Sequence, residues 1–276
     1  MRSLLLLFTT FVMLAVCGLE LKAQSLPRVG EAIVVSRLRA SRAPTVRAGD
    51  RTITIVRVDP SRYRFRLFTE SHDGSRRPLP RWIGDENLTG GINAGMFLPD
   101  GRTVGFSMVD GVVRSNRRPA MFTAVVGLDP VTAASSRLAM GGEGCAVDLD
   151  GLRRTHRSVL QVRKLLLSCQ GEPLSWPNRR RYSAAAFGID EHGHAVLVHC
   201  RTPYRMDELS EMLHDLDPGL RALAFMEGGP EASLIVRGGS VNVAEVGSYE
   251  DGFNENDDNR AFWDLPNIIG FAPRDL

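Results

Sequence analysis

The stretch from Leu223 to Arg237, LAFMEGGPEASLIVR, indicates how the centre of this chain folds. Two short apolar runs, 223–226 and 234–236, are typical of buried strands. Between them, Gly228 and Gly229 allow a turn in which the backbone takes positive φ. The pattern predicts that a core strand holds the Glu227 carboxylate rigidly at the rim of a pocket. The alternative is a solvated glutamate on a tight turn.

A second glycine-rich stretch, Gly90–Phe97 (GGINAGMF), lies earlier in the chain. Together with Met226–Ser233 (MEGGPEAS), it resembles the two sequence blocks of the phosphodiester glycosidase family, the domain of the lysosomal uncovering enzyme. The closing segment Leu265–Gly270 resembles the last strand of the bacterial branch. The resemblance spans about residues 30–275, and its first block is the more specific one.

The resemblance implies an exported hydrolase that attacks the anomeric carbon of a sugar and releases a phosphate ester. The expected substrate is therefore a carbohydrate or sugar phosphate. Glu227 would stabilise the positive ring, act as nucleophile or activate water. Asn93 would donate its amide to substrate, or alternatively hold its own loop. Glu231 would form an acid/base pair with Glu227, or be a surface carboxylate. The expected substrate-contacting residues are Gly95, Phe97, Arg181, Gly228, Gly229 and Ser233.

Two departures from the family pattern concern the expected chemistry. The family carries Asp where this chain has Glu227, and Arg where this chain has Ala184. Arg181, or its neighbours Arg179 and Arg180, would then supply the guanidinium from a shifted position. If none does, the domain would be a non-catalytic exported module that binds a glycan or phosphate. A structural envelope protein is a third, more distant alternative.

The first residues predict export. Arg2, an apolar run over 4–19 and Ala23 form a signal peptide over residues 1–23, which leaves a mature domain over 24–276. Once the signal is removed, we expect no membrane span and a secreted or periplasmic location. The box ending at Cys17 leaves lipoprotein anchoring as an alternative.

Composition bounds the remaining possibilities. A net charge of +2 and 43% hydrophobic residues suit one globular domain and give no nucleic-acid footprint. Of the cysteines beyond the signal, Cys145 and Cys169 are the expected pair, which leaves Cys200 free. We expect no cofactor. The acidic, amide-rich segment Tyr249–Arg260 is interpreted as a solvated loop, with a calcium site as the alternative.

The periodicity predicts an α+β fold, a mixed but mostly antiparallel sheet system with few helices in a single domain. One helix is expected from a Thr202 cap, with Pro203 in its first turn, to Leu216, and a weaker one around 154–162. The expected strands at 195–198 and 223–226, with this helix between them, would form one parallel crossover. Further strands are expected at 52–58, 62–67, 104–108, 121–126, 185–189, 195–198 and 241–246.

Overall fold

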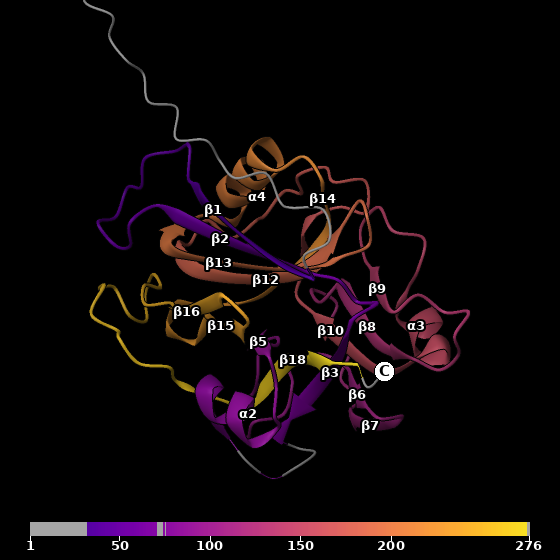
Figure 1. Cartoon of the computed structure of the whole chain (residues 1–276). Coiled ribbons are helices and arrows are strands. Elements are labelled where there is room, and N and C mark those ends of the chain that lie inside the picture. Colours follow the sequence, from indigo (N-terminus) through magenta and orange to yellow (C-terminus); the bar gives the residue numbers. More distant parts are fainter. Residues whose placement is uncertain (1–31, 71–73, 75, 275–276) are drawn as a thin grey trace, which may run out of the picture. The chain divides into compact units, whose positions relative to one another are not determined.

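The computed structural model describes residues 32–70, 74 and 76–274 (Figure 1). The predicted signal peptide, with Cys17 and the cleavage site after Ala23, lies outside these residues. The contiguous unit from Ala32 onward holds the sheets and helices. Among the described residues, no helix is long and apolar enough to cross a membrane.

A six-stranded sheet carries the stretch that contains Glu227. Its strand order is β1-β2-β13-β12-β14-β11, and every pair in it is antiparallel. The bounds of its strands are β1 Ile33–Arg39, β2 Thr52–Val58, β11 Leu165–Leu167, β12 Tyr182–Asp190, β13 Ala195–Tyr204 and β14 Leu220–Gly228.

Two five-stranded sheets and a small ribbon complete the β structure. One has the order β16-β15-β5-β18-β3, with bounds Val241–Val246, Ser233–Gly238, Gly90–Asn93, Asn267–Pro273 and Tyr63–Thr69. The other has the order β7-β6-β10-β8-β9, with bounds Val112–Ser115, Ser107–Val109, His156–Val162, Ala124–Pro130 and Leu138–Gly141. The ribbon pairs β17 (Asp264–Leu265) with β4 (Arg77–Pro78).

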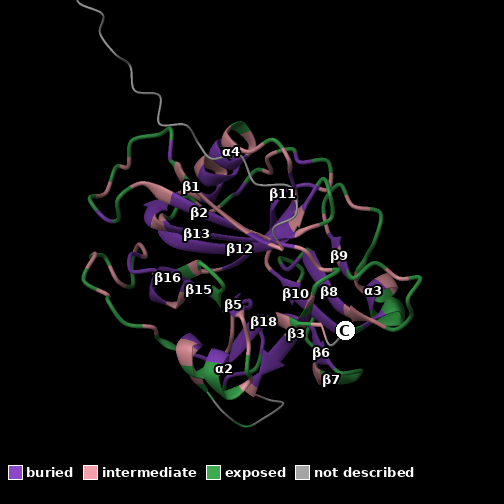
Figure 2. Cartoon of the chain, in the orientation of Figure 1, coloured by how far each residue is buried: buried purple, intermediate pink, exposed green. Residues whose placement is uncertain are grey.

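The described helices cover the outer faces of these sheets (Figure 1). Residues of α4 (Met206–Leu216) pack on one face of the six-stranded sheet. Residues of α2 (Leu79–Asp85) pack on β15 and β18, and α3 (Leu149–Thr155) packs against β8 and β10. The largest cluster of buried side chains joins all three sheets, which is the purple centre of Figure 2. Apolar burial of this kind is the main source of folding free energy.

The α+β prediction is confirmed, since antiparallel sheets dominate and few helices accompany them. The predicted crossover also exists in outline. β13, α4 and β14 follow one another, and β13 and β14 run in the same direction because each is antiparallel to β12. However, β12 lies between them, so they do not pair directly as neighbours.

The predicted helix boundaries need two corrections. Thr202 and Pro203 belong to β13, and the helix begins at Met206, where the Glu208 carboxylate accepts a hydrogen bond from the Arg205 backbone N–H (3.1 Å). The predicted helix around 154–162 is wrong. Asp148 caps a short helix that ends at Thr155, and residues 156–162 form strand β10, which pairs with both β8 and β6. A strand paired on two sides and covered on both faces lacks the alternation that would have revealed it.

The sequence analysis also missed a strand inside the glycine-rich block. Residues 90–93 form β5, the middle strand of its sheet, between β15 and β18. A Cβ at Gly90 would lie 2.6 Å from the Ile235 carbonyl oxygen and 2.7 Å from the Phe271 ring. Glycine is needed here because neighbouring backbone and an aromatic ring approach so closely.

The disulfide prediction is confirmed. Cys145, after β9, is bonded to Cys169, which follows β11, and Cys200 is a free, buried thiol. The bond closes a loop with a sequence separation of 24 between two different sheets. A loop of this length restricts the unfolded chain appreciably.

We expect a Cys145→Ala/Cys169→Ala double variant to lose about 2–4 kcal/mol of unfolding free energy, because the unfolded chain regains the freedom of that loop. Urea unfolding with and without reductant measures this loss. Reductant should destabilise the wild-type protein and leave the double variant unchanged. An equal response of both proteins would contradict a stabilising disulfide.

Candidate active site

The carboxyl end of β14 turns the Glu227 side chain toward the space between the sheets. Ala186 is paired with Phe225, but the next residue of β12, Ala185, is paired with Glu227, so Met226 is an extra residue in β14. Such a register shift re-aims the side chains that follow it. Directly paired residues share a face, so Glu227 lies on the inner face with Ala185, a member of the core between the sheets.

Two further carboxylates converge on Glu227. After Gly228, the chain forms the 3₁₀ turn η1 (Gly229–Glu231), which brings Glu231 back beside it. Glu250 comes from the segment after β16, where it forms a β-bridge with Tyr182. A Cβ at Gly229 would lie 2.6 Å from Glu250 Oε2 and 3.4 Å from Glu231 Oε2, so this glycine, at φ 67°, separates the two acids. We call Glu227, Glu231 and Glu250 the carboxylate cluster.

The cluster holds protons more tightly than free carboxylates do. Burial raises the pKa of Glu227 well above its ordinary value, and the charges of Glu231 and Glu250 raise it further. Burial, together with the charge of Glu250, raises the pKa of Glu231 to about 7. Burial also raises the pKa of Glu250, against the opposing charge of Arg180. Near neutral pH the cluster therefore contains both a carboxylic acid and a carboxylate.

Asn93 and Ser233 form a second set of polar groups, on the sheet that faces β14. Asn93 Oδ1 accepts a hydrogen bond from the Ser233 backbone N–H (3.0 Å), which ties β5 to the first residue of β15. Both side chains are buried, yet Asn93 Nδ2 and Ser233 Oγ have no hydrogen-bond partner among the described residues. The Asn93 side chain therefore supports its loop, which was the alternative expectation for this residue, and its Nδ2 also retains a free donor. Buried polar atoms are rarely left without partners, so these two atoms are candidates for substrate contact.

Comparison with known proteins gives the family. The family model for phosphodiester glycosidase matches residues 86–272, which include Asn93 and the whole carboxylate cluster. This chain belongs to the phosphodiester glycosidase family. No curated protein matches the sequence.

Solved structures of similar fold are distant in sequence. The catalytic domain of zebrafish N-acetylglucosamine-1-phosphodiester alpha-N-acetylglucosaminidase, auto-inhibited by its pro-peptide, superposes with a TM-score of 0.63 at 14% identity. That match covers 89% of this chain and 85% of the zebrafish chain. A hypothetical protein from Synechocystis superposes with a TM-score of 0.57 at 14% identity, covering 88% of this chain and 62% of that one. At these identities the likeness establishes the fold.

The arginine that phosphodiester glycosidases carry on the strand before the helix has no counterpart at Ala184. Ala184 is buried beneath α4, on the opposite face of β12 from Ala185. The structure places the Arg181 guanidinium away from the cluster, on Thr45 Oγ1 (2.5 Å) and on the carboxylate of Glu208 in α4 (3.4 Å). Arg181 is thus held in an ion pair with the helix.

Arg180 lies beside the cluster, and Arg163 lies near Tyr182, the bridge partner of Glu250. The Arg180 charge lowers the pKa of Glu250, and a Cβ at Gly252, two residues further on, would lie 3.9 Å from Arg180 Cζ. The Arg163 guanidinium lies 5.6 Å from the centre of the Trp176 ring. Within the described part of the chain, neither arginine forms an ion pair, and none of the three cluster carboxylates does. Both positive charges therefore remain available to a bound anion.

The other predicted contact residues have packing roles in the structure. Gly228 is the last residue of β14, where a Cβ would lie 2.6 Å from the Ser183 carbonyl oxygen. Gly95 has φ 69°, and a Cβ there would lie 3.1 Å from the Val162 side chain. The Phe97 ring lies 5.4 Å from the Arg76 guanidinium, on the loop after β5. The two glycines thus allow close approach of neighbouring chain, and Phe97 packs against Arg76.

Sequence reasoning missed Glu250, because it lies at the edge of the segment interpreted as a solvated loop. Only the bridge to Tyr182 brings it beside Gly229, and no local pattern encodes that long-range contact. In the calcium alternative for Tyr249–Arg260, the loop oxygens would bind a metal. In the structure, several of them accept hydrogen bonds from Arg201: Asp257 O, Asp257 Oδ1 and Asn259 O. Among the described residues, no group of three acidic, His or Cys side chains is arranged to hold a metal.

We expect Asn93→Ala and Ser233→Ala to separate loop support from catalysis. Asn93→Ala leaves the Ser233 N–H without its buried acceptor and should lose about 1–3 kcal/mol of stability. Ser233→Ala removes a hydroxyl without a partner and should change stability by less than about 1 kcal/mol. If both groups contact substrate, turnover per folded molecule falls about 10²-fold or more in each. Normal turnover in folded Ser233→Ala would assign this hydroxyl no role in the reaction.

The raised pKa of Glu231 predicts how stability depends on pH. The folded protein keeps a proton on Glu231 up to about pH 7, whereas the unfolded chain releases it near its ordinary value of 4.5. Wild-type stability therefore decreases as the pH rises through this window. Glu231→Gln cannot ionise, so at pH 8 its melting temperature should exceed that of the wild type by about 2–4 °C, about 1 kcal/mol.

This difference should vanish below pH 4.5, where Glu231 is protonated in both states. Glu191→Gln, at the exposed turn between β12 and β13, is the matched control and should follow the wild-type curve. Parallel curves for Glu231→Gln and wild type from pH 4 to 8 would show that Glu231 titrates like a free carboxyl.

Proposed function

We propose that this protein is an exported hydrolase that cleaves a sugar-1-phosphodiester, or a related glycosidic bond, of a surface or extracellular glycan. Family membership supports the glycosidase class. The observation that carries the proposal is the carboxylate cluster at the end of β14, with raised pKa values and no ion-paired cation among the described residues. Two carboxyl groups with different proton affinities are the machinery that glycoside hydrolysis requires.

In this reaction the bond between the anomeric carbon and the ester oxygen breaks, and its electron pair leaves with the phosphate. Water, or first a carboxylate, forms the new bond to the anomeric carbon. Burial and the charges of both neighbouring acids all raise the pKa of Glu227. We therefore assign to Glu227 the proton that assists departure of the phosphate. Glu231, with a pKa of about 7, can accept the proton of the attacking water.

The leaving phosphate diester carries negative charge, which needs a positive or hydrogen-bonding partner. Arg180 beside Glu250 and Arg163 over Trp176 are without ion pairs in the described chain, and Arg180 borders the cluster. A guanidinium binds two phosphate oxygens with a planar pair of donors. In this proposal they replace the arginine that the family carries at the position of Ala184. The free donor of Asn93 would bind the sugar.

Export is part of the proposal. The disulfide between Cys145 and Cys169 is of the kind that persists in oxidising compartments. The predicted signal peptide over residues 1–23 agrees with this location. Intact mass of native protein distinguishes a mature chain that begins at Gln24 from one acylated at Cys17, and retention of Met1 would contradict both.

Glu227→Gln tests the assignment of the acid. With glycosyl-1-phosphodiesters as substrates, its kcat should fall by about 10²–10⁴-fold, because the amide keeps the shape of the side chain but neither gives up nor accepts a proton. Glu227→Asp should also be poor, since it withdraws the carboxyl group by one methylene, about 1.5 Å. Melting temperature and substrate affinity should change little in either variant.

Glu191→Gln serves again as the exposed-glutamate control and should retain wild-type turnover. Full activity of Glu227→Gln would remove Glu227 from the mechanism and leave Glu231 as the next candidate. Wild-type protein that binds the phosphodiesters tightly and hydrolyses none would instead support the non-catalytic binding module.

A further inference from the structure

A cavity of about 460 Å³ opens beside the six-stranded sheet, at the edge opposite to the carboxylate cluster. Its walls come from β1, β2, β13, β16 and the segment after β16. Apart from Gly49, its lining residues are charged or carry a hydroxyl group, and they come from distant parts of the sequence: Arg37, Asp50, Thr52, Arg201, Glu245 and Asp257. The volume lies in the range of small-molecule sites.

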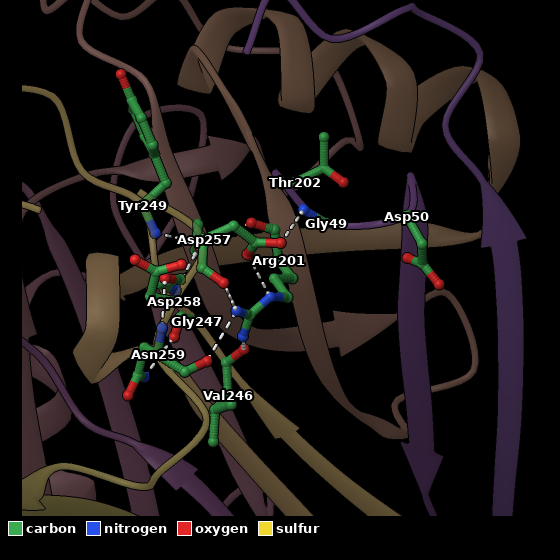
Figure 3. A network of polar contacts seen from close by, with 12 residues as sticks. Gly49, Asp50, Arg201, Thr202, Val246, Gly247, Tyr249, Asp257, Asp258 and Asn259 are labelled. Atoms are coloured by element: carbon green, nitrogen blue, oxygen red, sulfur yellow. Dashed lines mark hydrogen bonds and ion pairs between the residues drawn. The ribbon is translucent and has the colours of Figure 1, made fainter. Parts of the chain in front are cut away.

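One wall of this cavity is rigid because Arg201 holds it. Its guanidinium donates to Asp257 Oδ1 (2.7 Å) and to the carbonyl oxygens of Val246 (2.8 Å), Asp257 (3.0 Å) and Asn259 (2.8 Å). Asp257 Oδ2 in turn accepts from the Gly49 N–H (3.1 Å). Figure 3 shows Arg201 at the centre of this network, with Asp50 apart from it, just before β2. The partly buried guanidinium thus fixes the position of the wall before any ligand arrives.

The remaining charged groups of the cavity are only partly engaged. Arg37 lies 3.9 Å from Glu245, beyond hydrogen-bond distance, and its side chain is 52% exposed. Glu245 Oε1 accepts one hydrogen bond, from Thr54 Oγ1 (3.1 Å), while its Oε2 lies 4.0 Å from His199 Nδ1. Asp50 Oδ1 accepts from the Thr52 N–H (2.9 Å). The cavity therefore offers free guanidinium donors next to free carboxylate oxygens.

We propose that this cavity binds the ring of a neutral sugar, as a site separate from the carboxylate cluster. A sugar hydroxyl both donates and accepts, so neighbouring hydroxyls satisfy Arg37 with their oxygens and Glu245 and Asp50 with their protons. Hydrogen bonds to charged side chains are among the stronger ones. Two arginines against three carboxylates leave little net charge, which disfavours phosphate and gives a neutral ligand the advantage.

The register of the sheet separates the two sites. Arg37, Thr54, His199, Ala185 and Glu227 form one transverse row across β1, β2, β13, β12 and β14. His199 and Ala185, in the middle of the row, are buried under β15, and His199 Nε2 is bonded to the Ala232 carbonyl oxygen (3.3 Å). Four strand spacings place the ends of the row about 19 Å apart. Arg37, on the far side of the cavity, is therefore separated from Glu227 by three strands, whereas Arg201 lies on β13, two strands from β14.

Saturation-transfer NMR on the purified chain, with the methyl α-glycosides of glucose, mannose and N-acetylglucosamine, tests the proposal. We expect at least one glycoside to bind. Arg37→Ala and Glu245→Gln should each weaken that binding at least tenfold, whereas Arg81→Ala, an exposed arginine of α2, should not. Since Arg37 is half exposed, its variant is expected to fold even if Glu245→Gln is destabilised.

Asn93→Ala distinguishes this site from the proposed active site, because it removes the donor that would bind the sugar there, and it should leave glycoside binding at the cavity unchanged. Binding that is lost in folded Asn93→Ala but kept in Arg37→Ala would place the sugar at the proposed active site and overturn the proposal. Absence of saturation transfer to all three glycosides at 20 mM (roughly the weak-binding limit of such sites), or binding of inorganic phosphate in their place, would overturn it as well. Failure to hydrolyse phosphodiesters would leave the cavity result unaffected.

Discussion

The pairing of β14 with β12 is the constraint on which the candidate site depends. One extra residue in β14 changes the register just before the strand ends, and the change turns Glu227 onto the inner face beside Ala185. Without the shift, alternation would point Glu227 toward α4, where Ala184 and Phe225 pack. The carboxylate thus faces Glu231 and Glu250 because of backbone hydrogen bonding, rather than because of a partner for its own charge.

Charges are handled in opposite ways at the two ends of this sheet. At the carboxylate cluster, burial without an ion-paired cation keeps protons on the acids, as their raised pKa values show. At the cavity, the Arg201 guanidinium donates hydrogen bonds to the partly exposed oxygens of a loop and so balances their negative charge. The carboxylate cluster therefore keeps protons that can take part in a reaction, and the Arg201 network gives the cavity a rigid wall.

The sequence predicted those features of the fold and site that are encoded within one short segment. Glu227 near the end of a buried strand, the turn that begins at Gly229, and the helix that ends before Asp217 all follow from local periodicity and turn residues, although Gly228, expected in the turn, belongs to the strand. The features that it missed depend on pairing between distant segments. Glu250 reaches the site through its bridge to Tyr182, and 156–162 is a strand because it has partners on both sides. Arg181 is close enough in sequence to Ala184 to have been expected at the site, but its guanidinium forms an ion pair with Glu208 on α4.

The replacement of the family's aspartate by Glu227 has a geometric consequence in this fold. The longer side chain extends the carboxyl group about 1.5 Å further from the backbone. It projects from a strand whose position is fixed by pairing on both sides, so the strand does not move to compensate. Glu231 and Glu250 stand on either side of Gly229, where any side chain would collide with Glu250. The glutamate, the glycine and the two flanking acids therefore fit one another as a set, and the same fixed backbone that accommodates Glu227 would hold an aspartate short of its neighbours.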